Sequence, residues 1–270
     1  RVFCAMRTES GTITEALTLE GVSKTFVASP PLRVIEDIDL SIYQGEFVSL
    51  IGPSGCGKST LLAILAGLLE PTTGSAHFTH HPDKTLLGEV AYMPQKDLLL
   101  PWRSLLDNTI IGMELRGWDR TTSRRRALEL FPTFGLAGFE DYYPANVSGG
   151  MRQRAAFLRT LLADRSILLL DEPFGALDAL TRANLQVWLL NLWESLETTI
   201  VLVTHDVEEA LLLSDRICVM TERPGHIKEI ITVPWNRPRT FSIVTTPEFT
   251  AMRSALLNSL YADSPSEESR

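Results

Sequence analysis

The chain of 270 residues has little of three things, and each shortage excludes a class of protein. Its longest unbroken apolar run, Leu61 to Leu69, is about half of the ~20 residues that a membrane-spanning helix requires. Its cysteines, Cys4, Cys56 and Cys218, are odd in number and widely spaced, which suits neither a disulfide framework nor a zinc site. Its formal net charge is −8, so no overall positive field attracts nucleic acid or anionic lipid. We therefore expect a cytosolic chain that does not cross a membrane and binds no nucleic acid.

Hydrophobic residues make up 44% of the chain, enough to bury a sizeable core. Short β-branched runs separated by turn formers predict a β-rich opening, and a glycine-rich turn then leads into a segment of helix-forming composition. Residues 98–162 are rich in Leu, Ala and Arg and predict a mostly helical insert. The predicted strands are Leu17–Leu19, Val34–Ile42, Phe47–Ile51 and Val90–Met93, and the predicted helix after the turn is Ser59–Leu69.

The second half of the chain predicts a parallel sheet. Ile167–Leu170 is the most apolar strand candidate. A helical segment, Leu180–Leu196, separates it from the next candidate, Thr199–Thr204, and Ile217–Met220 offers another. Strand, helix and strand at this spacing are typical of parallel strands joined by crossover helices, so the fold class is α/β.

A phosphate-binding loop follows the predicted strand Phe47–Ile51, because residues 52–59 fit the pattern G-x-x-x-x-G-K-S/T. Glycines let backbone amides point inward at phosphate oxygens, and the helix that begins near Lys58 adds the positive end of its dipole. Lys58 would reach the β- and γ-phosphates, and Ser59 would offer a hydroxyl to Mg²⁺. A plain turn is the alternative, but a strand before and a helix after favour nucleotide binding. The candidate nucleotide-binding residues are Gly52, Pro53, Ser54, Gly55, Cys56, Gly57, Lys58, Ser59 and Thr60.

Two carboxylates close the most apolar strand, at the edge where open parallel sheets place their ligands. Side chains of adjacent residues diverge, so the two should do different work. Asp171 would orient Mg²⁺, and Glu172 would polarise the attacking water as a general base. Carboxylates at a strand end can also cap the next turn, but the phosphate loop elsewhere in the chain favours the catalytic interpretation.

A second amide-rich helix start occurs at Ser148-Gly149-Gly150, ahead of a segment of Arg, Gln, Ala and Leu. Such a start is suited to an anion. Taken alone, Ser148 is more simply an N-cap.

With these motifs in this order, the chain resembles the ATP-binding subunits of ABC transporters, from about Leu17 to about Ile230. The resemblance implies an α/β fold of the P-loop NTPase (RecA-like) type, with a parallel-sheet core, an antiparallel β subdomain and a helical insert. It also implies ATP hydrolysis with ATP and Mg²⁺ bound. By resemblance, Ser148, Gly149 and Gly150 form the signature motif, Phe26 stacks on adenine, Gln95 is the Q-loop glutamine and a further metal ligand, Asp178 is the D-loop aspartate and His205 is the switch histidine.

Each of the last four residues, Phe26, Gln95, Asp178 and His205, has a simpler explanation when taken alone, as a core residue, a turn residue or a satisfied polar group.

The resemblance further implies a site shared between chains, in which the signature of one chain closes over ATP held by the phosphate loop of the other. The expected partners are a second copy or a paired ABC subunit, transmembrane permease subunits and, through the complex, a periplasmic or lipid-anchored solute-binding protein. The expected location is the cytoplasmic side of the bacterial inner membrane.

The resemblance also predicts a division of the chain. A flexible leader covers residues 1–16, and the nucleotide-binding domain covers 17–235, with a helical subdomain at about 98–160 inserted in its core. A C-terminal extension covers 236–270, and its last residues are expected to be disordered.

Two segments resemble bacterial importers of the nitrate, sulfonate and taurine group: Leu98–Asn108 and Asp215–Ile227. They predict a small solute, such as one of these anions. The rival is an ABC ATPase that acts on nucleic acid or ribosomes; such proteins usually carry two cassettes or a long coiled-coil insert, and neither is evident here.

Two side-chain hypotheses need a structure to decide them. Cys56 lies within the phosphate loop, so we expect alkylation to inhibit hydrolysis unless the thiol is a small filler turned away from the ligand. The apolar run Leu98–Trp102 beside Gln95 is expected to receive a helix of the permease, unless it packs inside the helical subdomain.

Overall fold

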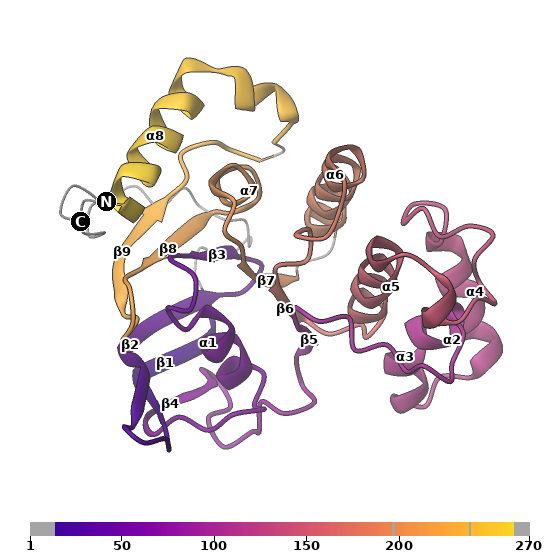
Figure 1. Ribbon diagram of the computed structural model, residues 1–270, viewed down its shortest axis with the longest axis horizontal. Coiled ribbons are helices and arrows are strands. Elements are labelled where there is room, and N and C mark those ends of the chain that lie inside the picture. The colour runs from indigo at the N-terminus through magenta and orange to yellow at the C-terminus, as the bar shows by residue number, and fades with distance from the viewer. Residues whose placement is uncertain (1–13, 196–197, 238, 262–270) are drawn as a thin grey trace.

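The computed structural model describes residues 14–195, 198–237 and 239–261, and these form two sheets surrounded by helices (Figure 1). In this part of the chain, no helix is long and apolar enough to span a bilayer. The strands are β1 (Glu15–Phe26), β2 (Leu32–Tyr43), β3 (Phe47–Ile51), β4 (Thr73–Phe78), β5 (Ala91–Met93), β6 (Ile167–Asp171), β7 (Thr199–Val203), β8 (Arg216–Met220) and β9 (Ile227–Thr232). The helices are α1 (Lys58–Leu65), α2 (Leu105–Thr109), α3 (Ile111–Leu115), α4 (Arg120–Leu130), α5 (Gly149–Leu161), α6 (Ala179–Ser195), α7 (Val207–Leu213) and α8 (Pro247–Tyr261), with 3₁₀ turns η1 (Pro144–Asn146) and η2 (Phe241–Thr245).

The larger sheet has six described strands in the order β5-β6-β7-β3-β8-β9, parallel except for β9. Every residue of β3, β6, β7 and β8 is buried, because helices and the second sheet cover both faces. This explains why their sequences are mostly apolar and do not alternate with polar residues. The strand order places β6 and β7 side by side and β3 next to β7, so the ends of three strands meet at one edge.

The smaller sheet is antiparallel, in the order β2-β1-β4. Helix α1 lies between the two sheets: Leu61 and Leu65 share a buried cluster with Leu17 of β1 and Leu169 of β6. The helix ends earlier than predicted, since Gly67 has φ +68° and a Cβ there would lie 2.5 Å from the backbone nitrogen of Leu87.

The helical insert of α2 to α5 lies between β5 and β6 in the chain and to one side of the large sheet in space (Figure 1). Its buried side chains, such as Phe134 and Phe157, share one core with Phe47 of β3 and Leu189 of α6. The predicted mostly helical insert is therefore present, and it packs on the sheet through α6.

The end of the described chain covers the other side of the large sheet. Helix α8 packs beside α7 through Phe249 and Leu256, which join a cluster with Ile217 and Val219 of β8. Residues 1–13 of the predicted leader, 1–16, lie outside the described residues, and its last two residues belong to β1, which begins at Glu15. The predicted disorder of the last residues concerns positions 262–270, which also lie outside the described part. Strands β4 and β9 and helices α7 and α8 were not anticipated from the sequence.

Candidate active site

The phosphate loop curls around the ammonium group of Lys58. The Nζ atom donates hydrogen bonds of 2.8 Å to the carbonyl oxygens of both Gly52 and Pro53, and the side chain is only 7% exposed. The curl needs glycine at Gly57, where φ is +112° and a Cβ would lie 2.4 Å from the side chain of Ile35. Helix α1 then begins at Lys58 with no side-chain cap on its first amides. The first amides of α1 and one buried cation therefore together suit an anion.

Asp171 ends β6 beside this loop, with the Ser59 hydroxyl close enough to its carboxylate to lower the pKa of that group. Burial raises the pKa of Asp171; the Ser59 hydroxyl and the nearby Lys58 oppose that shift, while the charge of Glu172 adds to it. Among the described residues, Oδ1 of Asp171 is buried and has no hydrogen-bond partner.

An unpartnered buried carboxylate oxygen next to a serine hydroxyl fits Mg²⁺, which takes few protein ligands and fills its shell with phosphate and water oxygens. Within the described part of the chain there is no group of three or more His, Cys, Asp or Glu residues that could hold a metal without such help. The predicted pair Ser59 and Asp171 therefore suits a nucleotide-bound Mg²⁺ rather than an all-protein metal site.

Glu172 collects the other predicted catalytic residues. Gln95 donates from Nε2 to Oε2 of Glu172 at 3.3 Å, and Nδ1 of His205 lies 3.4 Å from the same oxygen. The backbone of Glu172 has φ of 49°, a left-handed conformation that costs energy for a residue with a side chain, and its amide is fixed to the carbonyl of Val203 at 2.9 Å. Three segments that are far apart in the sequence thus meet at one carboxylate.

A buried polar group behind His205 was missed by the sequence reasoning. The Thr204 hydroxyl donates to Oε2 of Glu209 at 2.7 Å and accepts from the amide of Asp206 at 3.0 Å, so it fixes the turn that presents His205. Gln186 of α6 donates to the other oxygen of Glu209 at 3.0 Å. Desolvation raises the pKa of Glu209. The spacing of an N-cap Asp206 and a Glu three residues later is a capping pattern that could have revealed this group.

Two arginines of α5 hold the segment that follows Gln95, and these also were not foreseen. Arg152 donates from Nε to Asp97 at 3.0 Å, and Arg159 donates to the carbonyls of Asp97 and Leu98 at 2.7 and 2.8 Å. The signature helix is thereby tied to the segment carrying Gln95.

The apolar run beside Gln95 divides between surface and interior. Leu98 and Trp102 are 60% and 71% exposed, whereas Leu99 is 8% exposed. Asn108 is fully buried and donates to three carbonyls of the loop, so the exposed side chains stand on a fixed backbone. Leu99 is thus buried in the helical subdomain, as the alternative predicted, whereas Leu98 and Trp102 are not.

The signature residues lie apart from the phosphate loop of the same chain. Ser148 caps α5 by accepting from the amide of Met151 at 3.2 Å, and Gly149 and Gly150 form its first turn. Figure 1 shows α5 and α1 on opposite sides of β6. Ser148 and Gly149 are exposed, so the amides of this helix start face outward from the fold.

Asp178 and Phe26 occupy simpler positions. Asp178 is exposed and accepts from the amide of Thr181 at 2.9 Å, and hydrogen bonds from Thr181 lower the pKa of Asp178. Phe26 ends β1 with 37% of its surface exposed, and the ammonium of Lys24 lies 5.5 Å from its ring centre. Exposure leaves both side chains available to a ligand or a partner.

The alkylation hypothesis for Cys56 is wrong about the thiol. The side chain is 1% exposed and packs in the apolar cluster between the sheets, so it is the small filler that the alternative predicted. Its sulfur still contacts the loop's lysine, because Nζ of Lys58 donates to Sγ at 3.8 Å, and the amide of Cys56 donates to the carbonyl of Pro53 at 3.3 Å.

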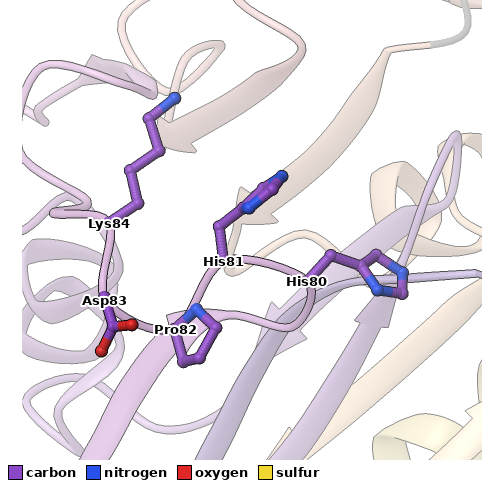
Figure 2. A pocket seen from close by; sticks show the side chains of 5 residues that line it. All are labelled: His80, His81, Pro82, Asp83 and Lys84. Atoms are coloured by element: carbon purple, nitrogen blue, oxygen red, sulfur yellow. The ribbon is translucent and has the colours of Figure 1, made fainter.

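A surface hollow lined by residues 80–84 is separate from this site (Figure 2). Its lining comes from one short stretch beyond β4, and the charged ends of Asp83 and Lys84 point in opposite directions. No convergent set of groups marks it as a binding site.

Comparison with known proteins decides the family. The family model described as ABC transporter matches residues 35–175, which include the phosphate loop, the signature helix and both strand-end carboxylates. The chain belongs to the ABC transporter family. It is therefore an ATPase, and the resemblance read from its motifs, the fold class and ATP binding are confirmed.

Curated relatives are import ATP-binding proteins. The formylaminopyrimidine import ATP-binding protein of Halalkalibacterium halodurans is 42% identical over 250 residues, covering 93% of this chain and 96% of that one. The nitrate import ATP-binding protein of Synechococcus elongatus is 40% identical over 91% of each chain. The bicarbonate transport ATP-binding protein of a Synechocystis species is 39% identical over 92% of this chain and 90% of the other.

A solved relative has the same fold. It is an ATP-binding cassette in a dimeric, post-hydrolysis state bound to ADP and phosphate, with a TM-score of 0.74 and 29% identity over 82% of this chain and 100% of the other.

Proposed function

We propose that this ABC ATPase works as a head-to-tail dimer that drives import of a small solute through separate permease subunits. The observation that carries the proposal is the convergence of Gln95 and His205 on Oε2 of Glu172, next to a phosphate loop that already surrounds a buried lysine. Structural ion pairs can bring three polar residues together, but a strained backbone at their centre is typical of a reaction site.

The proposed chemistry uses the side chains and backbone groups of the candidate active site. Lys58 would leave its two loop carbonyls and pair with the β- and γ-phosphates, and the backbone amides from Gly52 to Thr60 would hold phosphate oxygens. Glu172 would accept a proton from the attacking water, while His205 would donate a hydrogen bond to the γ-phosphate. Phe26 would offer its exposed ring to adenine.

Ser59 and Asp171 would hold Mg²⁺, with Gln95 offering its amide oxygen to the ion or to the water. When bound, the ion neutralises charge that develops on the phosphates. Gln95 donates its amide nitrogen to Glu172, which leaves the amide oxygen for this role.

The proposed dimer supplies what one chain lacks. Ser148, Gly149 and Gly150 of one chain would close over ATP held by the loop of the other, and Asp178 would lie at the same junction. Support comes from the outward-facing start of α5 and from the dimeric cassettes among the solved relatives. The second subunit is either an identical copy or a paired ABC subunit.

Leu98 and Trp102 would receive a cytoplasmic helix of the permease. Large exposed apolar side chains on a rigid loop are suited to a partner, because they bury area at little cost in conformational entropy. The loop joins Gln95 to α5 through Arg152 and Arg159, so a partner seated there would touch both halves of the site.

The solute class and the location rest on the relatives. Nitrate and bicarbonate, named for two of them, are small anions, and the third carries a formylaminopyrimidine; we propose a small solute of the first kind, delivered by a solute-binding protein outside the membrane. The chain would then sit at the cytoplasmic face of a bacterial inner membrane. The net charge of −8 disfavours the alternative of a nucleic acid or ribosome partner.

The deciding experiment is purification of the tagged full chain from membranes of its host. Recovery of permease subunits, followed by ATP-dependent uptake in vesicles rebuilt from that complex, would support import. Recovery of ribosomes or nucleic acid without permease subunits would reject it. Titration of candidate anions against the solute-binding protein of the complex would then name the solute.

A further inference from the structure

The turn between β8 and β9, residues 221–226, is a rigid unit. The amide of Thr221 donates to the carbonyl of His226 at 3.0 Å, and the amide of His226 donates to Oγ1 of Thr221 at 3.1 Å. Gly225 is also tied to β2: its amide donates to the carbonyl of Val34 at 2.9 Å, and its carbonyl accepts from the amide of Glu36 at 3.0 Å. The turn is thus fixed from both its own strands and the smaller sheet.

This rigid turn touches the backbone of the phosphate loop. A Cβ at Gly225 would lie 2.1 Å from the carbonyl oxygen of Cys56. A Cβ at Gly52 would lie 2.9 Å from the carbonyl oxygen of Met220, the last residue of β8. Two glycines therefore allow the turn and the loop to meet at both ends of the loop's curl.

Arg223, at the tip of the turn, holds the middle of the loop. Its Nε and Nη2 atoms both donate to the carbonyl oxygen of Gly55, at 2.9 and 2.7 Å. Because a peptide unit is planar and trans, the carbonyl of Gly55 and the amide of Cys56 point in opposite directions. Fixing that carbonyl outward therefore turns the Cys56 amide toward the loop interior, where it donates a hydrogen bond to the carbonyl of Pro53 at 3.3 Å.

We propose that Arg223 is a positioning residue for nucleotide binding, which holds the Gly55–Cys56 peptide with its amide directed at the phosphates. The proposal rests on the phosphate-binding role assigned to the loop. Without the guanidinium, a glycine at φ +76° has other conformations open to it, and the loop would lose entropy when it closes on a ligand. This entropic cost is the same for the bound substrate and for the transition state. It therefore raises KM and Kd and leaves kcat unchanged.

The test compares Arg223 with Arg116, an arginine that has the same charge but does not contact the phosphate loop. Arg116 is exposed and donates to the backbone carbonyl of Ala163 at 3.1 Å, far from the loop in sequence and on the helical insert. Binding of Mg–ADP to the full chain is measured by titration calorimetry for wild type, Arg223→Gln and Arg116→Gln, and steady-state ATP hydrolysis gives kcat and KM. Thermal unfolding is recorded for each.

Arg223→Gln is expected to weaken Mg–ADP binding and raise KM by about three- to tenfold, because the loop loses the two hydrogen bonds that hold the Gly55 carbonyl, with kcat within about twofold. Arg116→Gln should bind as wild type does. The proposal would be overturned if Arg223→Gln bound Mg–ADP as tightly as wild type does. It would also be overturned if both glutamine variants lost the same affinity, because that result would mean that net charge alone is responsible.

Arg223→Lys keeps the charge but not the paired donors, and should fall between wild type and Arg223→Gln. Should the glutamine variant fail to fold, the lysine variant decides, and wild-type affinity in it overturns the proposal. Wild-type protein that binds no Mg–ADP, or Lys58→Ala that binds it undiminished, would instead reject the phosphate loop itself. The two failures are therefore distinguishable.

Discussion

The edge of the six-stranded sheet and the helical insert differ in where their functional groups find partners. At the sheet edge, Lys58, Glu172 and His205 already contact groups of their own chain. On the insert, Ser148 and Trp102 lie exposed on backbones that are firmly held. A region whose side chains are partnered within the chain can be tested in the isolated subunit. A region that is rigid but exposed points to another chain, and its variants should matter only when that chain is present.

The sharpest test of the sheet edge is Glu172→Gln. The amide keeps the shape and loses the base, so kcat should fall by about 10²–10⁴ while Mg–ATP still binds, and closed dimers should accumulate in size-exclusion chromatography. Glu89→Gln, on a carboxylate paired with Lys84 away from the site, is the control. Near-normal turnover by folded Glu172→Gln protein would contradict the assignment of the base.

Lys58→Ala should act on binding instead of turnover. It removes a buried cation that is available to two phosphates, and Mg–ATP affinity should drop by about 30- to 100-fold in calorimetry. Lys84→Ala, which removes an exposed lysine from the pair with Glu89, should leave affinity unchanged. Undiminished binding by Lys58→Ala would mean that the loop does not cradle phosphate.

On the insert, Trp102→Glu should preserve the fold and ATP binding of the isolated chain and lose copurification with the permease. An aromatic anchor in an interface is typically worth about 2 kcal/mol or more, roughly 30-fold in affinity. Leu115→Glu is the matched control, because Leu115 is 84% exposed on the same insert at α3. Copurification of Trp102→Glu with the permease at the wild-type level would end the docking claim.

Ser148→Ala tests whether the signature belongs to another chain's site. Turnover by the dimer should fall by about tenfold, whereas Mg–ADP affinity of the monomer should stay within about twofold. Ser104 caps α2 by accepting from the amide of Asp107 at 3.2 Å, the same distance as at Ser148, so Ser104→Ala controls for the lost cap. Weakened binding in the monomeric Ser148→Ala protein would erase the distinction between the two regions.

The strands and the loop of the sheet-edge region could be predicted from the sequence because their signals are local. The phosphate loop and the strand Ile167–Leu170 are each specified by consecutive residues, so a short stretch of sequence is enough to predict them. Open parallel sheets then bring the ends of their strands together. The direction of a single side chain is not local information. Cys56 was interpreted as a loop thiol, yet it is buried in the cluster between the two sheets, most of whose residues lie elsewhere in the chain.

The elements that were missed depend on distant partners. Strand β4 has a half-exposed, glycine-containing sequence and exists because it pairs with β1, at least fifty residues earlier. Helix α8 is held by Phe249 and Leu256 against α7 and β8. The two arginines of α5 that hold Asp97 lie 55 and 62 residues after it, and no spacing pattern in the sequence predicts such a contact.

The smallest expected effect concerns stability at the sheet edge. Asp171 is 2% exposed, its Oδ1 has no partner among the described residues, and burial raises the pKa of this carboxyl above its ordinary value of 3.8. A raised folded-state pKa means that the folded protein holds this proton to higher pH than the unfolded chain does. The free energy of unfolding therefore loses a contribution as pH rises from about 4 through the folded-state pKa.

Asp171→Asn removes that buried charge, so the ligand-free variant should be more stable than wild type at pH 7 by about 1 kcal/mol while losing Mg²⁺-dependent ATPase activity. Urea unfolding at several pH values measures the difference, which should shrink toward zero below pH ~4, where both states of wild type are protonated. Asp107→Asn is a contrasting control, because Asp107 is paired with Arg120 and Arg124 and its neutralisation should destabilise the fold. A destabilised Asp171→Asn protein would mean that Ser59 and Lys58 satisfy the carboxylate, and the sheet edge would then be complete without a metal.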